Sequence, residues 1–135
     1  MENIYESEYA KVEYIPKDHV VFHTWKKYCH LEDYRKPVRF SVELLYKYPG
    51  SDFVVDARNG FEDDKEDVAG GFDEFLPNMK KTACKNWVFI LNEVSDVEGE
   101  IDMWTNEIQK YFHVIRVTSY QQAITELRKN RTENA

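Results

Sequence analysis

Hydrophobic and polar positions in the first part of the chain predict two β-strands, a helix and a third strand. Glu8–Ile15 and His19–Trp25 read as strands joined by a short hairpin loop, and His19–Trp25 carries apolar side chains on both faces, which is typical of a central strand. Leu31–Tyr48 has apolar residues at helical spacing, and Pro37 is expected to kink this helix or to separate its first turn. Asp52–Asp56 predicts the third strand.

The rest of the chain alternates helix and strand patterns. In order, we expect a helix from near Asp63 with an apolar stripe that ends at Met79, a fully buried strand at Trp87–Leu91, a helix that opens with Ser95-x-x-Glu98 and buries Ile108 and Tyr111, a strand at His113–Val117, and a helix that opens with Ser119-x-x-Gln122. Residues 4–7 either extend the first strand or form a separate lead-in. The order ββαβαβαβα indicates a single α/β domain over residues 1–129 with a mixed, mostly parallel sheet, followed by a polar, frayed tail over residues 130–135.

Composition narrows the classes of function. The 135 residues carry a formal net charge of −7 and a pI near 5.1, so general nucleic-acid binding is disfavoured, because an acidic domain repels phosphate backbones. No apolar run approaches the roughly 18 residues that a membrane span needs, and the N-terminus lacks the pattern of a signal peptide. Cys29 and Cys84 belong to no motif. These features together predict a cytoplasmic protein with reduced thiols.

The segment Phe53–Gly60 is the most informative stretch for function. A β-rich apolar run stops on Asp56, Arg58 and Asn59, as a buried strand does when it delivers polar groups to the carboxyl edge of an open α/β sheet. Asp56 and Arg58 are two residues apart and can pair, so the segment is either a structural ion pair or a recognition site in which Arg58 supplies charge and Asn59 a hydrogen-bond donor. Gly60 is expected to need a positive φ at this turn.

Two aromatic residues belong to the same expected edge. Trp25 and Tyr28 fall where the second strand passes into the first helix, and parallel pairing would bring that junction beside Asp56 and Arg58. Aromatic side chains next to polar groups form either a hot spot for a partner or one wall of a small pocket. The candidate partner- or ligand-binding residues are therefore Trp25, Tyr28, Asp56, Arg58 and Asn59.

The element order, together with particular residues, resembles the SpoIIAA-like group of the STAS superfamily, whose better-known members are anti-sigma-factor antagonists. The resemblance rests on Thr24–Trp25, Val54–Asn59, Leu76–Pro77, Trp87–Ile90, and Val117–Ser119 leading into Ala123–Ile124. It implies a mixed sheet with helices packed largely on one face. Phosphoregulated antagonists carry a serine or threonine at the start of the helix after the third strand. Residues 58–64 contain neither, so we do not expect that phosphorylation switch here.

Other constellations predict no catalytic, metal or cofactor site. The acidic residues between 62 and 67 lack the spacing of a calcium loop and read as a solvated helix start. His19 and His23, four residues apart on a strand, are too distant to share a zinc ion. No glycine-rich phosphate loop and no serine nucleophile elbow is present.

We therefore expect a non-catalytic, STAS-like interaction module that binds a protein partner, and a second copy of the chain in a homodimer is one such partner. The alternative is a binding protein for a small apolar or lipid-like ligand, held in an aromatic pocket between sheet and helices. An enzyme that uses Asp56 or a cysteine is the third hypothesis.

Overall fold

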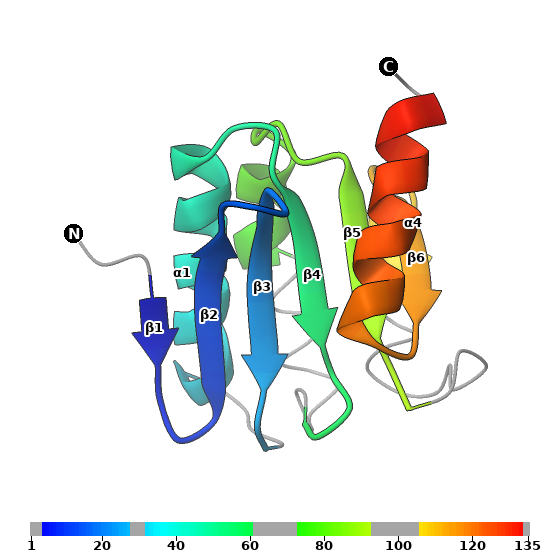
Figure 1. Ribbon diagram of the computed structural model, residues 1–135. Helices are drawn as coiled ribbons and strands as arrows, with labels where there is room; N and C mark the ends of the chain where they lie inside the picture. The colour runs from blue at the N-terminus through cyan, green and yellow to red at the C-terminus, as the bar shows by residue number, and fades with distance from the viewer. Residues whose placement is uncertain (1–3, 28–31, 61–72, 93–105, 134–135) are drawn as a thin grey trace.

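The computed structural model describes residues 4–27, 32–60, 73–92 and 106–133. They form an α/β fold built on a six-stranded mixed sheet in which the strands lie in the order of the sequence (Figure 1). The strands are β1 (Ile4–Glu6), β2 (Ala10–Ile15), β3 (Val20–Trp25), β4 (Asp52–Asp56), β5 (Asn86–Ile90) and β6 (His113–Val117). The lead-in before the first predicted strand is thus a strand of its own, at one edge of the sheet.

Pairing divides the sheet into two parts. β1, β2 and β3 are antiparallel, whereas β3, β4, β5 and β6 are parallel. The parallel strands therefore share one carboxyl edge and one amino edge. β4 and β5 are buried at every position, as the continuous apolar runs predicted, and β3 is a central strand.

Helices cover both faces of the sheet, but unequally. α1 (Glu32–Lys47) and the helical residues 73–79 and 106–108 pack on one face, and α4 (Tyr120–Glu133) is the one described helix on the other (Figure 1). α1 continues through Pro37, which is buried in its second turn. The predicted starts of the two middle helices, near residues 63 and 95, lie outside the described residues.

The sheet separates two hydrophobic cores of different composition. The core beneath α1 is rich in aromatic residues, whereas the core beneath α4 is mainly aliphatic. Alternation along the strands accounts for this division, because successive side chains point to opposite faces. The α4 core contains Val20, Val54, Val88, Ile90, Val117, Ala123, Ile124 and Leu127.

Two expectations about individual residues differ from the structure. Tyr111 is 48% exposed, with Lys80 Nζ 4.3 Å from its ring centroid, and Phe112 fills the core position instead. The helical spacing that placed Tyr111 inside stops at residue 108, where a turn begins. The tail expected to fray from residue 130 is helical through Glu133, and Arg131 bonds to the sheet.

The predicted cap of α4 is present in modified form. The Gln122 backbone N–H donates to Ser119 Oγ at 3.2 Å, as in a capping box. The Gln122 side chain accepts from the backbone N–H of Thr118 at 2.9 Å, one residue earlier than the capping pattern places it. No helix among the described residues is long and apolar enough to cross a membrane.

Candidate functional site

The sequence-predicted residues Trp25 and Asp56 both lie at the carboxyl edge of the parallel strands, but on opposite faces of the sheet, because Trp25 and Val55 belong to the core beneath α1. Thr24 pairs with Asp56, and Asp56 pairs with Ile90, so the ends of β3, β4 and β5 meet at one level. Trp25 is the last residue of β3. Tyr28 lies outside the described residues.

Asp56 and Arg58 form the pair that their spacing predicted. The Arg58 Nη2 donates to Asp56 Oδ2 at 2.7 Å, and Nε donates to Oδ1 at 3.0 Å. Asp56 Oδ1 also accepts the Arg58 backbone N–H at 3.1 Å. The carboxylate side chain is 6% exposed and the arginine side chain 38%. The carboxylate raises the pKa of Arg58, mainly through its hydrogen bonds, so the guanidinium stays charged.

Further contacts hold the loop that carries Arg58. The Ala57 N–H donates to the Ile90 carbonyl at 3.0 Å, and Asn92 Nδ2 donates to the Arg58 carbonyl at 3.1 Å. Asn59 and Asn92 are both exposed beside Arg58. We call Asp56, Arg58, Asn59 and Asn92 the Arg58 edge.

Gly60 ends this loop, but not for the expected reason. Among the described glycines, only Gly50 has a positive φ, of 86°. Gly60 is instead pressed against the backbone that follows β3. A Cβ there would lie 2.7 Å from the Cα of Lys27 and closer still to the Lys27 carbonyl. Glycine is required because two backbone segments approach each other, which sequence alone does not reveal.

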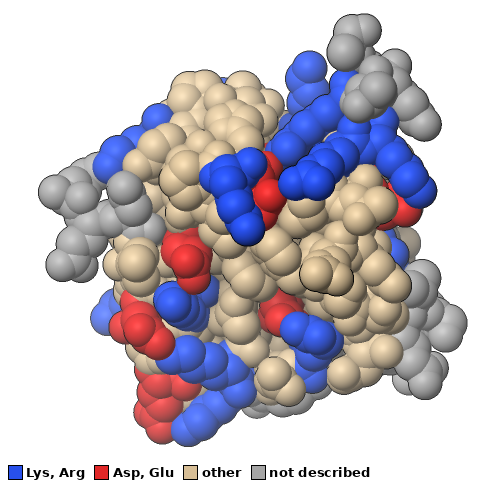
Figure 2. Space-filling model, viewed as in Figure 1, with Lys and Arg blue, Asp and Glu red and all other residues tan. Residues whose placement is uncertain are grey.

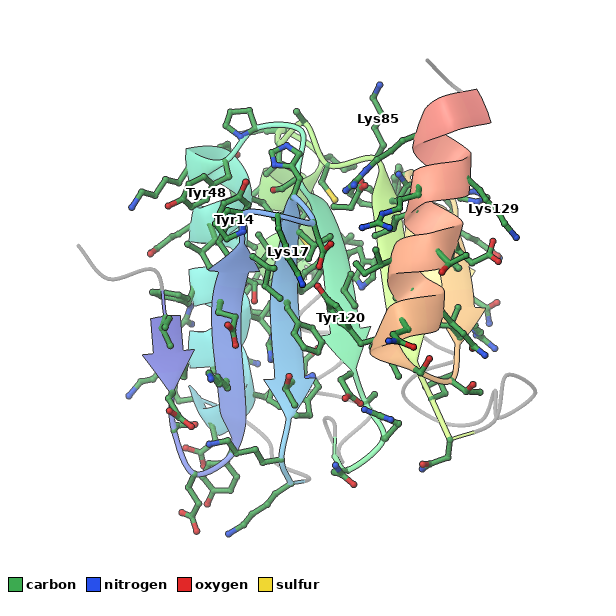
Figure 3. The ribbon with its side chains drawn as sticks, in the orientation of Figure 1. Tyr14, Lys17, Tyr48, Lys85, Tyr120 and Lys129 are labelled. Atoms are coloured by element: carbon green, nitrogen blue, oxygen red, sulfur yellow. The ribbon has the colours of Figure 1, made fainter. Side chains whose placement is uncertain are left out.

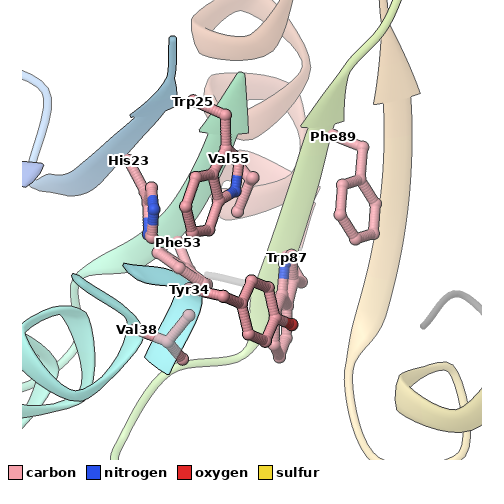
Figure 4. Close-up of a pocket in the computed structure, with 8 residues that line it drawn as sticks. All are labelled: His23, Trp25, Tyr34, Val38, Phe53, Val55, Trp87 and Phe89. Carbon is pink, nitrogen blue, oxygen red and sulfur yellow. The ribbon is translucent and has the colours of Figure 1, made fainter. Parts of the chain in front are cut away.

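Trp25 is part of the core rather than of the surface. It is 1% exposed, and its ring stacks on Tyr34 with centroids 5.4 Å apart. Both rings line a cavity of about 20 Å³ between the sheet and α1 (Figure 4). That volume holds about one water molecule. Trp25 thus lines a small cavity in the core, and its role in binding a partner or a ligand stays a prediction.

His23 lines the same cavity and is fully buried. Its Nδ1 lies 2.9 Å from Ser41 Oγ, and that hydroxyl donates its own hydrogen to the Pro37 carbonyl at 3.0 Å. Nδ1 must therefore carry the imidazole hydrogen, and Nε2 keeps a lone pair. Nε2 has no hydrogen-bond partner among the described residues. Burial lowers the pKa of His23 to about 3, so the ring is neutral.

The amino edge of the sheet holds a polar network that the sequence did not indicate. Asp52 is buried, and its Oδ2 accepts from Arg131 Nη2 at 2.9 Å and from Nε at 3.1 Å. Asp52 Oδ1 accepts from the Asn86 side-chain and backbone nitrogens. Arg131 also donates to the carbonyls of Asp18 and His19. Asp52 and Arg131 are 79 residues apart, so no local spacing could have paired them.

A second buried carboxylate, that of Asp18, binds two further residues of α4, Tyr120 and Arg128. Asp18 is buried in the β2–β3 loop, and its Oδ2 accepts from the Tyr120 hydroxyl at 2.7 Å. Arg128 Nη2 lies 3.6 Å from Asp18 Oδ1. Burial, followed by the bond to Asp18, raises the pKa of Tyr120, which therefore remains protonated. Figure 3 shows Tyr120 at the start of α4, facing the sheet.

Neither a cluster of metal ligands nor an activated thiol is found among the described residues. No group of three His, Cys, Asp or Glu side chains converges among residues 4–27, 32–60, 73–92 and 106–133. Cys84 is buried, and burial together with the charge of Asp52 raises its thiol pKa to about 12. A thiol in that state is a poor nucleophile. Cys29 and His30 lie outside the described residues.

The geometry of the two sheet edges is the basis for any functional inference. The carboxyl edge presents a fixed arginine, and the amino edge presents a network anchored by α4. In comparisons with known proteins, no family model, no curated protein and no solved structure matches the chain.

Proposed function

We propose that this chain is a non-catalytic interaction module that binds a protein partner through the Arg58 edge. One observation carries the proposal: a buried carboxylate, Asp56, holds the Arg58 guanidinium in one orientation at the carboxyl edge of the sheet. Arg58 uses Nε and Nη2 for that pair, whereas Nη1 makes no hydrogen bond with any residue that the structure describes. A guanidinium held in this way binds a partner carboxylate with little loss of side-chain entropy.

The neighbouring side chains complete a polar contact surface. Asn59 and Asn92 are exposed beside Arg58, and their amides supply both donors and acceptors. The loop itself is held by Ile90, Asn92 and the backbone at Lys27, so the surface is preformed.

The hydrogen bonds of Asp56 and the raised pKa of Cys84 favour a binding role over a catalytic one. Both oxygens of Asp56 accept hydrogen bonds from Arg58, so the carboxylate is not free to act as a base or a nucleophile. The raised pKa of Cys84 makes that thiol unsuitable as a nucleophile.

The alternative of a small apolar or lipid-like ligand has less support. The aromatic cavity of about 20 Å³ has room for about one water molecule, whereas ligand pockets usually measure about 300–1,000 Å³. Binding of such a ligand would require the core beside Trp25 and Tyr34 to open.

A STAS-like fold remains part of the proposal. The mixed sheet, with most of its helical segments on the face opposite α4, is compatible with the resemblance noted in the sequence. The sequence after β4 has no serine or threonine from residue 58 to residue 64. We therefore propose that partner binding is not controlled by phosphorylation of that segment.

The test uses immobilised protein and quantitative capture from lysate of the source cells. Wild type is compared with Arg58→Glu and with Lys36→Glu, which makes the same charge change at an exposed position of α1. We expect proteins enriched by wild type and Lys36→Glu to fall by about tenfold or more with Arg58→Glu, because a charge-assisted hydrogen bond becomes a repulsion. Equal capture by all three proteins contradicts the proposal, as does the absence of any specific protein.

A second copy of the chain is distinguished by mass. Light scattering after gel filtration reports a dimer or a monomer directly. If wild type is a dimer and Arg58→Glu a monomer, the partner is the chain itself. If both are monomers, capture from lysate decides the proposal.

A further inference from the structure

The amino edge of the parallel strands contains an open depression of about 810 Å³. It lies at the opposite end of the sheet from the Arg58 edge, next to the C-terminal part of α4. Its volume falls within the range of small-molecule sites. We call it the basic depression, and the lining residues used here are His19, Gly50, Asp52, Lys85, Asn86, His113 and Arg131.

The charge lining this depression is positive, although the chain as a whole is acidic. The negative charge of Asp52 is matched by Arg131, with two hydrogen bonds between them. Lys85 and His113 are exposed, and Lys85 forms no ion pair with any residue that the structure describes. Figure 2 shows Lys and Arg side chains gathered at this upper end of the molecule, and Figure 3 shows Lys85 beside α4. Such a surface attracts anions.

His19 is held in an unusual conformation at the wall of the depression. Its φ is 54°, in the left-handed region that few non-glycine residues adopt. Its Nδ1 lies 2.7 Å from the Tyr14 hydroxyl, and the Tyr14 ring stacks on Tyr48 with centroids 3.7 Å apart (Figure 3). The imidazole is therefore fixed in position. Backbone strain of this kind persists where surrounding contacts hold it, often at ligand sites.

The second imidazole nitrogen of His19 is directed toward Gly50. A Cβ added at Gly50 would lie 3.5 Å from His19 Nε2. If the Tyr14 hydroxyl donates to Nδ1, then Nε2 carries the hydrogen and is a donor at the wall of the depression. Gly50 itself has a φ of 86°, so a glycine is favoured at the position that borders this donor.

Asn86 lies in the wall of the same depression, and its amide is fixed by Asp52. Its Nδ2 donates to Asp52 Oδ1 at 3.1 Å, and the reversed amide would set two oxygens against each other. The orientation of the amide is therefore settled, and Oδ1 is buried without a hydrogen-bond partner among the described residues. Because Oδ1 is closed off from solvent, Asn86 serves to hold Asp52 and supplies no contact to a bound anion.

We propose that the basic depression binds a small organic anion that carries two or more negative charges. The charged groups contact Lys85, His113 and the Nε2 of His19. Phosphate esters and polycarboxylates share this chemistry. This site lies at the other end of the sheet from the Arg58 edge, so it neither requires nor excludes the proposed protein partner.

The test is an NMR titration of the folded, ¹⁵N-labelled protein with inorganic phosphate, glycerol 3-phosphate and citrate. Sodium chloride at matched ionic strength is the reference for simple screening. We expect saturable amide shifts at residues 19, 50–52, 85–86 and 113. Tighter binding of glycerol 3-phosphate or citrate than of inorganic phosphate supports an organic anion, and comparison of the two identifies which class of anion is preferred.

Matched variants distinguish the depression from general attraction to lysines. Lys85→Gln should weaken binding by about tenfold, the effect of losing one charge-assisted hydrogen bond, while Lys36→Gln on α1 should leave binding unchanged. His19→Asn tests the oriented imidazole, because asparagine tolerates a left-handed backbone. The proposal is overturned if no anion gives saturable shifts beyond those of sodium chloride, or if Lys85→Gln and Lys36→Gln bind equally.

Discussion

The buried imidazole of His23 predicts a specific dependence of stability on pH. The side chains that line its cavity are all uncharged: Trp25, Tyr34, Val38, Phe53, Val55, Trp87 and Phe89. Protonation would place a hydrogen on Nε2, where no described acceptor is available. Folding therefore favours the neutral ring, and the folded pKa of about 3 lies far below the value of 6.5 for a free histidine.

The magnitude follows from linkage between protonation and folding. The folded pKa is depressed, so the unfolded chain binds a proton below about pH 6.5 while the folded chain does not. Stability is fully present above about pH 6.5 and falls as the pH drops, by up to about 1.4 kcal/mol per pH unit. Between about pH 7.5 and pH 5, the free energy of unfolding should fall by about 2 kcal/mol from His23 alone.

The assay compares urea unfolding of wild type and His23→Phe at these two pH values. Phenylalanine keeps the ring in the aromatic core, and Ser41 Oγ still donates to the Pro37 carbonyl. The other histidines are present in both proteins, so their contributions cancel in the difference. His23→Phe should therefore lose about 2 kcal/mol less than wild type on acidification. His113→Gln removes an exposed histidine and is the control that should retain the wild-type response of His23. If wild type and His23→Phe lose equal free energy, the imidazole is not held neutral and the reasoning fails.

Three further predictions concern packing, anchoring and reactivity. Gly60→Ala should lower the free energy of unfolding by about 1–3 kcal/mol, because its Cβ would meet the backbone after β3, and an unchanged urea midpoint would show that this approach is looser than described. Arg131→Met should lower the free energy of unfolding by about 2–3 kcal/mol, because it leaves the buried carboxylate of Asp52 without its cation. Adding Asp52→Asn to that variant should restore part of the lost stability. If it restores none, the charge pair is not the anchor of α4. Because burial raises the pKa of Cys84 to about 12, this thiol in a Cys29→Ser background should react with a thiol reagent only as fast as the protein opens, and rapid labelling of the native protein would contradict that burial.

Local patterns were sufficient to predict most of the secondary structure. β5 lies within one residue of the strand that the apolar run predicted, and β6 matches its predicted bounds. The Ser119 cap of α4 also followed from a short motif. Each of these features depends on residues within a few positions of one another, where spacing alone carries the information.

The Arg58 edge was predictable in part for the same reason. Asp56 and Arg58 are two residues apart at a strand end, so their pairing required no knowledge of the fold. The environment of Trp25 did require it. Whether an aromatic residue at a strand end faces solvent or the core depends on which face α1 covers, and that is decided by packing between distant segments.

The sequence by itself determined the α/β class, the buried central strands and the Asp56–Arg58 pair, because short-range periodicity and spacing specify them. Only the tertiary structure decided the rest. It brought Asp52 beside Arg131 across 79 positions, pressed Gly60 against the Lys27 backbone, and gathered Lys85 with His19 around one depression in an acidic chain. These contacts depend on sheet order and on the face that α4 occupies, which arise from the burial of apolar surface over the whole chain rather than from any local pattern.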